Sequence, residues 1–195
     1  ADPGSNLIVG FNQEMTSETY LKHLNEKTLP SILNFDEVNT GDAYFIDVGR
    51  IHAIGAGVLL AEIQQTSDIT YRVYDWDRLD DKGQSRELHN DLAIDAFNFN
   101  MPDNFRVAYS KAENQSNNMV SCPYFTTNYL KITKPIKIEN LYDSFMIYMC
   151  VAGEATITGP NFQEFFKTGE TILVPAMIKT FEITSKNATL LEVYV

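Results

Sequence analysis

The stretch that decides the predicted fold runs from Thr40 to Asp77 and reads TGDAYFIDVGRIHAIGAGVLLAEIQQTSDITYRVYDWD. Aromatic and β-branched residues fill four short runs within it, and glycines separate these runs. Both features are typical of short β-strands joined by tight turns. The stretch therefore predicts strands over residues 44–46, 51–54, 58–64 and 69–76, and it favours a β-barrel or a β-sandwich.

The same reasoning extends to both sides of this stretch. On the N-terminal side, the pattern predicts a strand at 7–11, a helix at 17–27 and a second helical turn from 28–30. On the C-terminal side, it predicts a helix led by 85–87, with Leu88, Leu92 and Ala96 on one stripe, and strands near 126–132, 145–151, 154–158, 171–174 and 190–195. Polar residues mark a connector, so we expect a first unit at 1–100, a connector at 101–118 and a second β unit at 119–195.

Composition limits the function classes. The 195 residues carry a net charge of −11, which opposes binding to nucleic acid or to an anionic membrane surface. No apolar run approaches the roughly 20 residues that a membrane span needs. Two cysteines in a chain of this length are typical of free thiols in a reducing compartment, so we expect a cytoplasmic protein.

Polar side chains are concentrated on the predicted strands between Arg50 and Arg78. The two-residue period of a strand places Glu62 and Gln64 on one face. A barrel lumen lined by His52, Glu62, Gln64 and Arg72 is therefore a reasonable arrangement. Buried polar groups of this kind need partners, which are other side chains, a metal ion or a ligand.

The same residues could instead have ordinary structural roles. His52 is either a hydrogen-bonded histidine or a ligand or acid/base group. Arg72 and Arg78 can pair with the nearby aspartates Asp68, Asp75 or Asp77. We interpret His89 as a residue on a helix face and assign it no catalytic role.

The sequence resembles the type I mannose-6-phosphate isomerases of the cupin superfamily, in particular the C-terminal portion of their short bacterial form. The resemblance rests on GDAYFI at 41–46, GRIHAIG at 49–55, LAEIQQTSDITYRVYDWDR at 60–78 and RELH at 86–89. It implies a mainly β fold of cupin-type barrel units with a few short helices. The first barrel would be incomplete and the second would be a degenerate cupin without a metal histidine.

The resemblance also implies a site. It maps a zinc-ligating histidine to His52 and the catalytic arginine to Arg72. We add Glu62 and Gln64 as side chains that contact either the sugar or the residues that bind the metal and the sugar. The implied reaction interconverts mannose 6-phosphate and fructose 6-phosphate through a metal-assisted enediol. The arginine would stabilise the negative charge of the enediolate.

The sequence departs from the family pattern in ways that bear on activity. Arg50 stands where many members have threonine, and Asp47-Val48 stands where they commonly have Pro-Ala. The family's other three zinc ligands lie in Gln-x-His and Gly-Lys-x-Glu segments that this chain lacks. We therefore expect weak zinc binding, little isomerase activity of the chain alone, and self-association through exposed strand edges. The alternatives are a non-catalytic cupin that binds a sugar or sugar phosphate, and another metal-dependent cupin activity.

Overall fold

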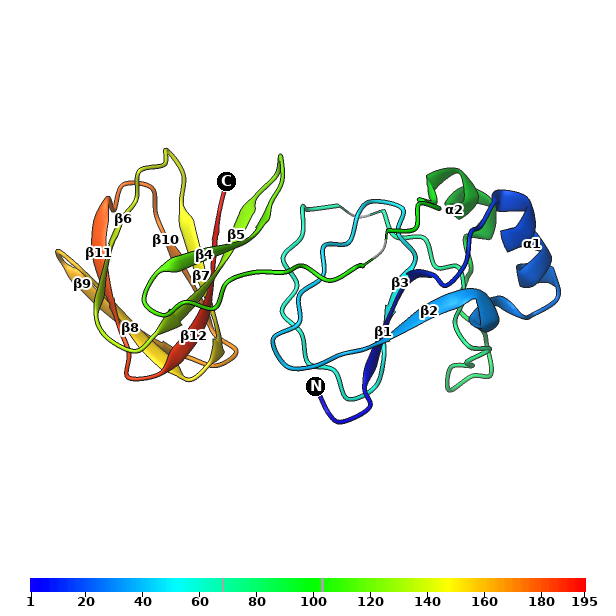
Figure 1. Cartoon of the computed structure of the whole chain (residues 1–195), viewed down its shortest axis with the longest axis horizontal. Helices are drawn as coiled ribbons and strands as arrows, with labels where there is room; N and C mark the ends of the chain where they lie inside the picture. The colour runs from blue at the N-terminus through cyan, green and yellow to red at the C-terminus, as the bar shows by residue number, and fades with distance from the viewer. Residues whose placement is uncertain (68, 103) are drawn as a thin grey trace. The chain divides into compact units, whose positions relative to one another are not determined.

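A computed structural model describes residues 1–67, 69–102 and 104–195. The chain divides into two compact units, Ala1–Arg106 and Val107–Val195, which we call unit 1 and unit 2. Figure 1 shows unit 1 from blue to green and unit 2 from green to red. Each unit is described by itself.

Unit 1 contains a three-stranded antiparallel sheet. Its central strand β1 (Asn6–Phe11) lies between β2 (Leu33–Glu37) and β3 (His52–Ile54). All but the first residue of β1 are buried, as expected for a strand with neighbours on both sides and side chains packed on both faces. Gly10 bends the end of β1 with φ +69°, and the Phe105 ring occupies the place where a Cβ would stand.

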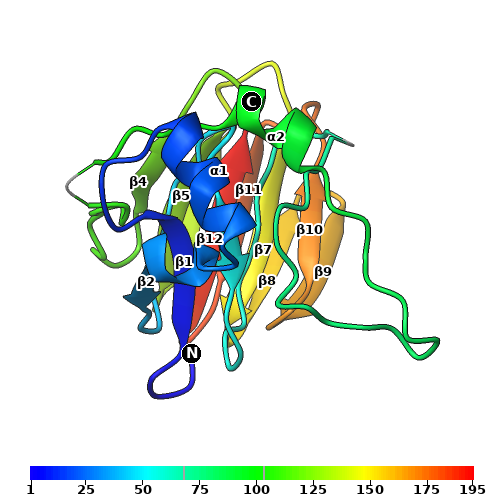
Figure 2. The same cartoon turned by 90° about the vertical axis from the view of Figure 1, so that its right-hand side faces the viewer.

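The helices of unit 1 lie at one end of β1, as the two views in Figures 1 and 2 agree. Helix α1 (Ser17–Asn25) begins at a capping box, in which Thr16 and Thr19 satisfy each other's backbone N–H groups. A short 3₁₀ helix, η1 (Leu29–Ile32), follows with Pro30 in its first turn, and α2 is Asn90–Ala96. The buried Tyr20 hydroxyl of α1 donates to Asn90 Oδ1 of α2 at 2.9 Å, which ties the two helices together.

Unit 2 is built from two antiparallel sheets. One has the order β10-β7-β12-β5-β4 and the other β6-β11-β8-β9. The strands are β4 (Ser116–Ser121), β5 (Thr126–Ile132), β6 (Ile136–Glu139), β7 (Met146–Ala152), β8 (Glu154–Gly159), β9 (Phe162–Lys167), β10 (Thr171–Val174), β11 (Thr180–Thr184) and β12 (Ala188–Tyr194). Figure 1 shows the two sheets facing each other.

One apolar core lies between the two sheets of unit 2. Both sheets supply fully buried side chains to it, such as Leu190 of β12 and Ile157 of β8. The carboxylate of Glu192 is buried on the same face of β12, where the residue is only 3% exposed. Its two oxygens accept hydrogen bonds from Asn128 Nδ2 at 2.8 Å and from the Tyr148 hydroxyl at 2.9 Å, which offset the loss of water.

Much of the predicted β structure is confirmed. The mainly β fold class holds, and β5 and β10 have the predicted bounds. The predicted strands at 7–11 and 51–54 correspond to β1 and β3, and the predicted helix at 17–27 corresponds to α1. No helix of the described residues combines the length and apolar character needed to cross a membrane.

Three predicted strands are wrong. Residues 44–46, 58–64 and 69–76 run without strand pairing, apart from an isolated bridge between Tyr44 and Arg106. Composition indicates only that a segment suits a pleated surface, whereas a strand also needs a neighbour to receive its hydrogen bonds. The lumen expected from the alternation of 58–64 and 69–76 therefore loses its geometric basis.

The predicted helix from 85–87 is also wrong at its start. Helix α2 begins at Asn90, and the expected stripe does not form a core face, because Leu88, Leu92 and Ala96 are exposed. Ala93 is the buried residue of the helix instead. A seven-residue helix covers too few turns for the apolar spacing to fix its inner face.

Candidate functional site

His52 opens β3 opposite Val9 of β1, and its side chain is exposed. Its Nδ1 lies 2.9 Å from the backbone oxygen of Arg50. Because a carbonyl oxygen only accepts, Nδ1 carries the hydrogen and Nε2 is the nitrogen left with a free lone pair. A histidine held in this way is suited to bind a metal or a proton through Nε2.

The turn before His52 is fixed by packing against the end of α2. Gly49 has φ +79°, and a Cβ there would lie 1.9 Å from the Ala96 oxygen, so only glycine fits. The next side chain, Arg50, is buried and forms an ion pair with Asp47 at 3.2 Å. Its guanidinium also donates to the carbonyl oxygens of Asn98 and Asn100, so Arg50 anchors the carbonyl that orients His52.

Arg72 is half-buried, and its backbone is held by His89 through two hydrogen bonds. The Arg72 N–H donates to His89 Nδ1 at 3.1 Å, and the His89 N–H donates to the Arg72 oxygen at 2.7 Å. His89 is therefore the N-cap residue of α2 rather than a helix-face residue, and the sequence interpretation was wrong. No ion pair or hydrogen bond joins the Arg72 guanidinium to a described residue, so its five donors are available to a ligand. Asp68, one of its predicted partners, lies outside the described residues.

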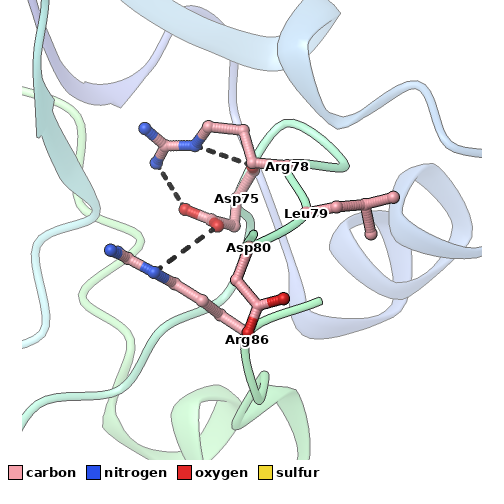
Figure 3. A pocket seen from close by; sticks show the side chains of 5 residues that line it. All are labelled: Asp75, Arg78, Leu79, Asp80 and Arg86. Atoms are coloured by element: carbon pink, nitrogen blue, oxygen red, sulfur yellow. Dashed lines mark hydrogen bonds and ion pairs between the residues drawn. The ribbon is translucent and has the colours of Figure 1, made fainter. Parts of the chain in front are cut away.

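A second group of arginines surrounds the buried Asp75, as Figure 3 shows. Arg78 forms an ion pair with Asp75, as one of the alternatives predicted, and Arg86 Nε lies 4.0 Å from the same carboxylate. They line a cavity of about 170 Å³ together with Leu79 and Asp80. Two arginines around one carboxylate leave several N–H donors for an anionic ligand.

The tight turn from Asp75 to Arg78 brings the side chains of these two residues together. Trp76 and Asp77 both have φ +52°, which is uncommon for residues with side chains. The turn is closed by the Arg78 N–H, which donates to the Asp75 oxygen at 3.1 Å. The Arg78 guanidinium lies 5.6 Å from the Trp76 ring centre, a cation-π distance. Spacing alone gave no sign of this turn.

Glu62 and Gln64 are both exposed, in the segment that was predicted to be a strand. Within the described part of the chain, no hydrogen bond or ion pair connects any two of His52, Glu62, Gln64 and Arg72. His52 and Arg72 are thus held by different contacts, and the four predicted side chains do not form one cluster.

Comparison with known proteins shows which proteins the chain resembles. Residues 115–195 match the model described as mannose-6-phosphate isomerase, cupin domain. A mannose-6-phosphate isomerase of Streptococcus mutans is 31% identical over 183 residues, which is 93% of this chain. The crystal structure of the mannose 6-phosphate isomerase from Bacillus subtilis superposes with a TM-score of 0.83 at 26% identity, over 98% of this chain.

The chain resembles mannose-6-phosphate isomerases over 93% of its length, and residues 115–195 match the cupin domain of that family. The resemblance read from the motifs and the cupin-type fold are therefore confirmed. The chain spans 57% of the length of the Streptococcus mutans relative and 60% of the solved Bacillus subtilis chain. A phosphomannose isomerase variant from Salmonella typhimurium shares the fold at 13% identity, with a TM-score of 0.68.

A metal ion is expected in a mannose-6-phosphate isomerase, so the fit of this chain's residues to zinc matters. A zinc site in a protein needs three or four nitrogen, sulfur or oxygen ligands within about 2.0–2.3 Å. No group of three histidine, cysteine, aspartate or glutamate side chains that suits a metal lies among the described residues. His52 is thus one suitable ligand, and the described residues by themselves do not fit a zinc site.

Proposed function

We propose that this chain contributes to a mannose-6-phosphate isomerase, which interconverts mannose 6-phosphate and fructose 6-phosphate. The similarity to the Streptococcus mutans mannose-6-phosphate isomerase over 93% of the chain carries the proposal. The reaction moves one proton between the first two carbons of the sugar through an enediol. The two free cysteines, Cys122 and Cys150, further support a cytoplasmic location.

In the proposed reaction, Arg72 stabilises the negative charge that develops on the enediolate oxygens. A guanidinium suits this task because it stays charged and presents several donors in a fixed plane. The His89 anchor supports it, because it fixes the backbone from which the half-buried Arg72 side chain extends. Glu62 and Gln64 would hydrogen-bond sugar hydroxyl groups.

His52 is proposed as one ligand of the isomerase metal through Nε2. The other ligands would come from polypeptide beyond the residues described, because these residues do not complete a site. We therefore propose that the 195-residue chain alone turns over mannose 6-phosphate poorly or not at all. A non-catalytic cupin that binds a sugar phosphate is the alternative function.

The test is a mannose 6-phosphate turnover assay on a chimera. The part of the Streptococcus mutans isomerase outside the match is joined to this chain, and the chain alone is assayed in parallel. We expect turnover by the chimera only, and a loss of about 10²-fold or more in kcat when Arg72→Met removes the guanidinium. Arg86→Met, which removes a guanidinium 4.0 Å from Asp75, is the matched control and should keep most of kcat.

Two results decide between the functions. A folded chimera that binds mannose 6-phosphate without turnover would favour the non-catalytic binding cupin. Equal kcat for the Arg72→Met chimera and its parent would contradict the role of Arg72, whatever the activity of the chain alone.

A further inference from the structure

His89 is the last residue of the RELH motif at 86–89 and contacts Arg72 directly. The two residues are 17 positions apart, and two hydrogen bonds join them. In the proposed reaction, His89 holds only the backbone of Arg72 through Nδ1 and the backbone N–H. The second ring nitrogen, Nε2, is not used there, although it belongs to a residue in contact with the proposed catalytic arginine.

The hydrogen bond from Arg72 fixes the tautomer of the His89 ring. A backbone N–H only donates, so Nδ1 is the nitrogen without a hydrogen, and in the neutral imidazole the hydrogen is on Nε2. The Tyr71 ring lies beside the imidazole, with the ring centres 6.3 Å apart, and limits its rotation. His89 therefore presents a fixed Nε2–H donor. This is the opposite tautomer to that of His52, whose Nδ1 carries the hydrogen.

The Nε2–H donor of His89 has no hydrogen-bond partner in the described part of the chain. His89 is half-buried and lines a hollow of about 250 Å³ together with Glu87, Asp91 and neighbouring residues. Among the described residues that line this hollow, two are carboxylates and none is a lysine or arginine. The charge of the hollow thus opposes a phosphate group but suits an uncharged group with hydroxyls, which both accept and donate hydrogen bonds.

We propose that His89 is a substrate-binding residue of the isomerase, whose Nε2–H donates a hydrogen bond to a hydroxyl oxygen of the sugar. Arg72 meets the reacting end of the same molecule, and Glu87 and Asp91 accept hydrogen bonds from sugar hydroxyls in the hollow. The proposal rests on the proposed isomerase function and adds a specific residue to it. The imidazole acts as a neutral donor, so no proton leaves it during the reaction.

Two substitutions separate the two ring nitrogens. In His89→Asn, the amide oxygen stands where Nδ1 lies, so the bond from the Arg72 N–H is kept and the outer donor is lost. In His89→Gln, the amide nitrogen reaches the place of Nε2, so the outer donor is kept and the bond from the Arg72 N–H is lost. His23→Asn is the matched control, because the His23 side chain bonds Thr28 beside α1.

Steady-state kinetics with mannose 6-phosphate are measured on the chimera described above. We expect His89→Asn to raise KM about fivefold and to keep kcat within about twofold, because a bond to a non-reacting hydroxyl is equally strong in the ground state and the transition state. His89→Gln should keep KM and lower kcat about fivefold or more, because Arg72 loses part of its anchor. His23→Asn should change neither constant.

A second measurement needs no turnover. Nitrogen-15 NMR at pH 8 should show the imidazole that is absent from His89→Asn as the Nε2–H tautomer. Mannose 6-phosphate should shift its Nε2 resonance, whereas inorganic phosphate at the same concentration should not, since the hollow binds the hydroxyl groups. The titration is made on the 195-residue chain and on the chimera, so binding that needs the longer protein is also detected.

Three results would each overturn the proposal. These are an Nδ1–H tautomer of His89, an Nε2 resonance that mannose 6-phosphate leaves unchanged in both proteins, and an active chimera in which His89→Asn has the KM of the parent. The last result contradicts the role of His89 and leaves the isomerase function standing. Conversely, a chimera that binds mannose 6-phosphate through His89 without turnover contradicts the isomerase function and leaves the contact standing.

Discussion

Unit 1 and unit 2 are both rich in β-forming residues, yet they use them differently. Unit 2 arranges β4 to β12 in two sheets around one core, whereas the described residues of unit 1 form three short strands and leave residues 58–67 unpaired. The contrast shows that a strand-forming sequence becomes a strand only where a neighbour receives its hydrogen bonds. Unit 2 supplies its own neighbours, and unit 1 does not supply all of them.

The largest expected effect is in the core of unit 2. Leu190→Ala removes a fully buried side chain between two sheets and should lower the free energy of unfolding of unit 2 by about 2–5 kcal/mol. Leu173→Ala, at a half-exposed position of β10, is the control and should change it by less than about 0.5 kcal/mol. Urea unfolding followed by far-ultraviolet circular dichroism measures both, and equal effects would contradict a core centred between the sheets.

Alkaline pH should weaken unit 1 through Tyr20. Burial raises the pKa of Tyr20 to about 12, from about 10 when unfolded. The unfolded chain therefore loses this proton first, so the stabilisation is complete below pH 10 and is lost as pH rises toward 12, by on the order of 2–3 kcal/mol. The lone tryptophan, Trp76, lies in unit 1 and reports urea unfolding there by fluorescence.

The control for this pH effect is Tyr20→Phe, which has no ionisable hydroxyl. The variant loses the hydrogen bond to Asn90 at every pH, but the further loss between pH 10 and pH 12 should be smaller than in the parent chain. Identical pH dependence of the two proteins would rule out Tyr20 as the group responsible.

A somewhat smaller effect is expected from the buried polar group of unit 2. Tyr148→Phe leaves one oxygen of the buried Glu192 without its donor, which should cost about 1–3 kcal/mol of unfolding free energy. Tyr142→Phe, at a residue that is 42% exposed, is the comparison and should cost less. If the Tyr148→Phe chain is as stable as its parent, the Glu192 carboxylate is satisfied by other groups.

The smallest effect is local and concerns Arg50. Arg50→Thr removes the guanidinium that anchors the turn, so the carbonyl that orients His52 should become mobile. Nitrogen-15 NMR of the imidazole should show one Nδ1–H tautomer in the parent at pH 8 and a mixture in the variant. Arg86→Thr, distant in sequence and without contact to this turn, should keep the single tautomer. A single tautomer in Arg50→Thr would show that the Arg50 side chain does not position His52.

The sequence predicted correctly those strands and helices whose formation depends on a local residue pattern. The strand at Thr126–Ile132 is rich in residues typical of strands, and its neighbours β4 and β12 lie within the same unit, so prediction and structure agree. The same reasoning failed for residues 58–64, because pairing is decided by distant chain segments that composition does not reveal. Strand β11 (TFEIT) was missed although Phe181 and Ile183 alternate with polar residues.

The candidate site was predicted in part for similar reasons. The Arg78 and Asp75 pair is three residues apart, and it was one of the pairings that the sequence left open. The anchoring of Arg72 by His89 joins residues that are 17 positions apart, and no local pattern indicates it. Whether His52, Glu62, Gln64 and Arg72 act together stays a prediction, because the described residues do not bring them into contact.

The contrast between the two units is tested most directly by hydrogen exchange of the 195-residue chain alone, read by mass spectrometry. The account predicts slow exchange for amides of β5, β7 and β12, which bond within the central part of a sheet, and near-unprotected exchange for residues 58–66. Comparable slow exchange in both regions of the monomeric chain would contradict it, because residues 58–66 would then have partners already.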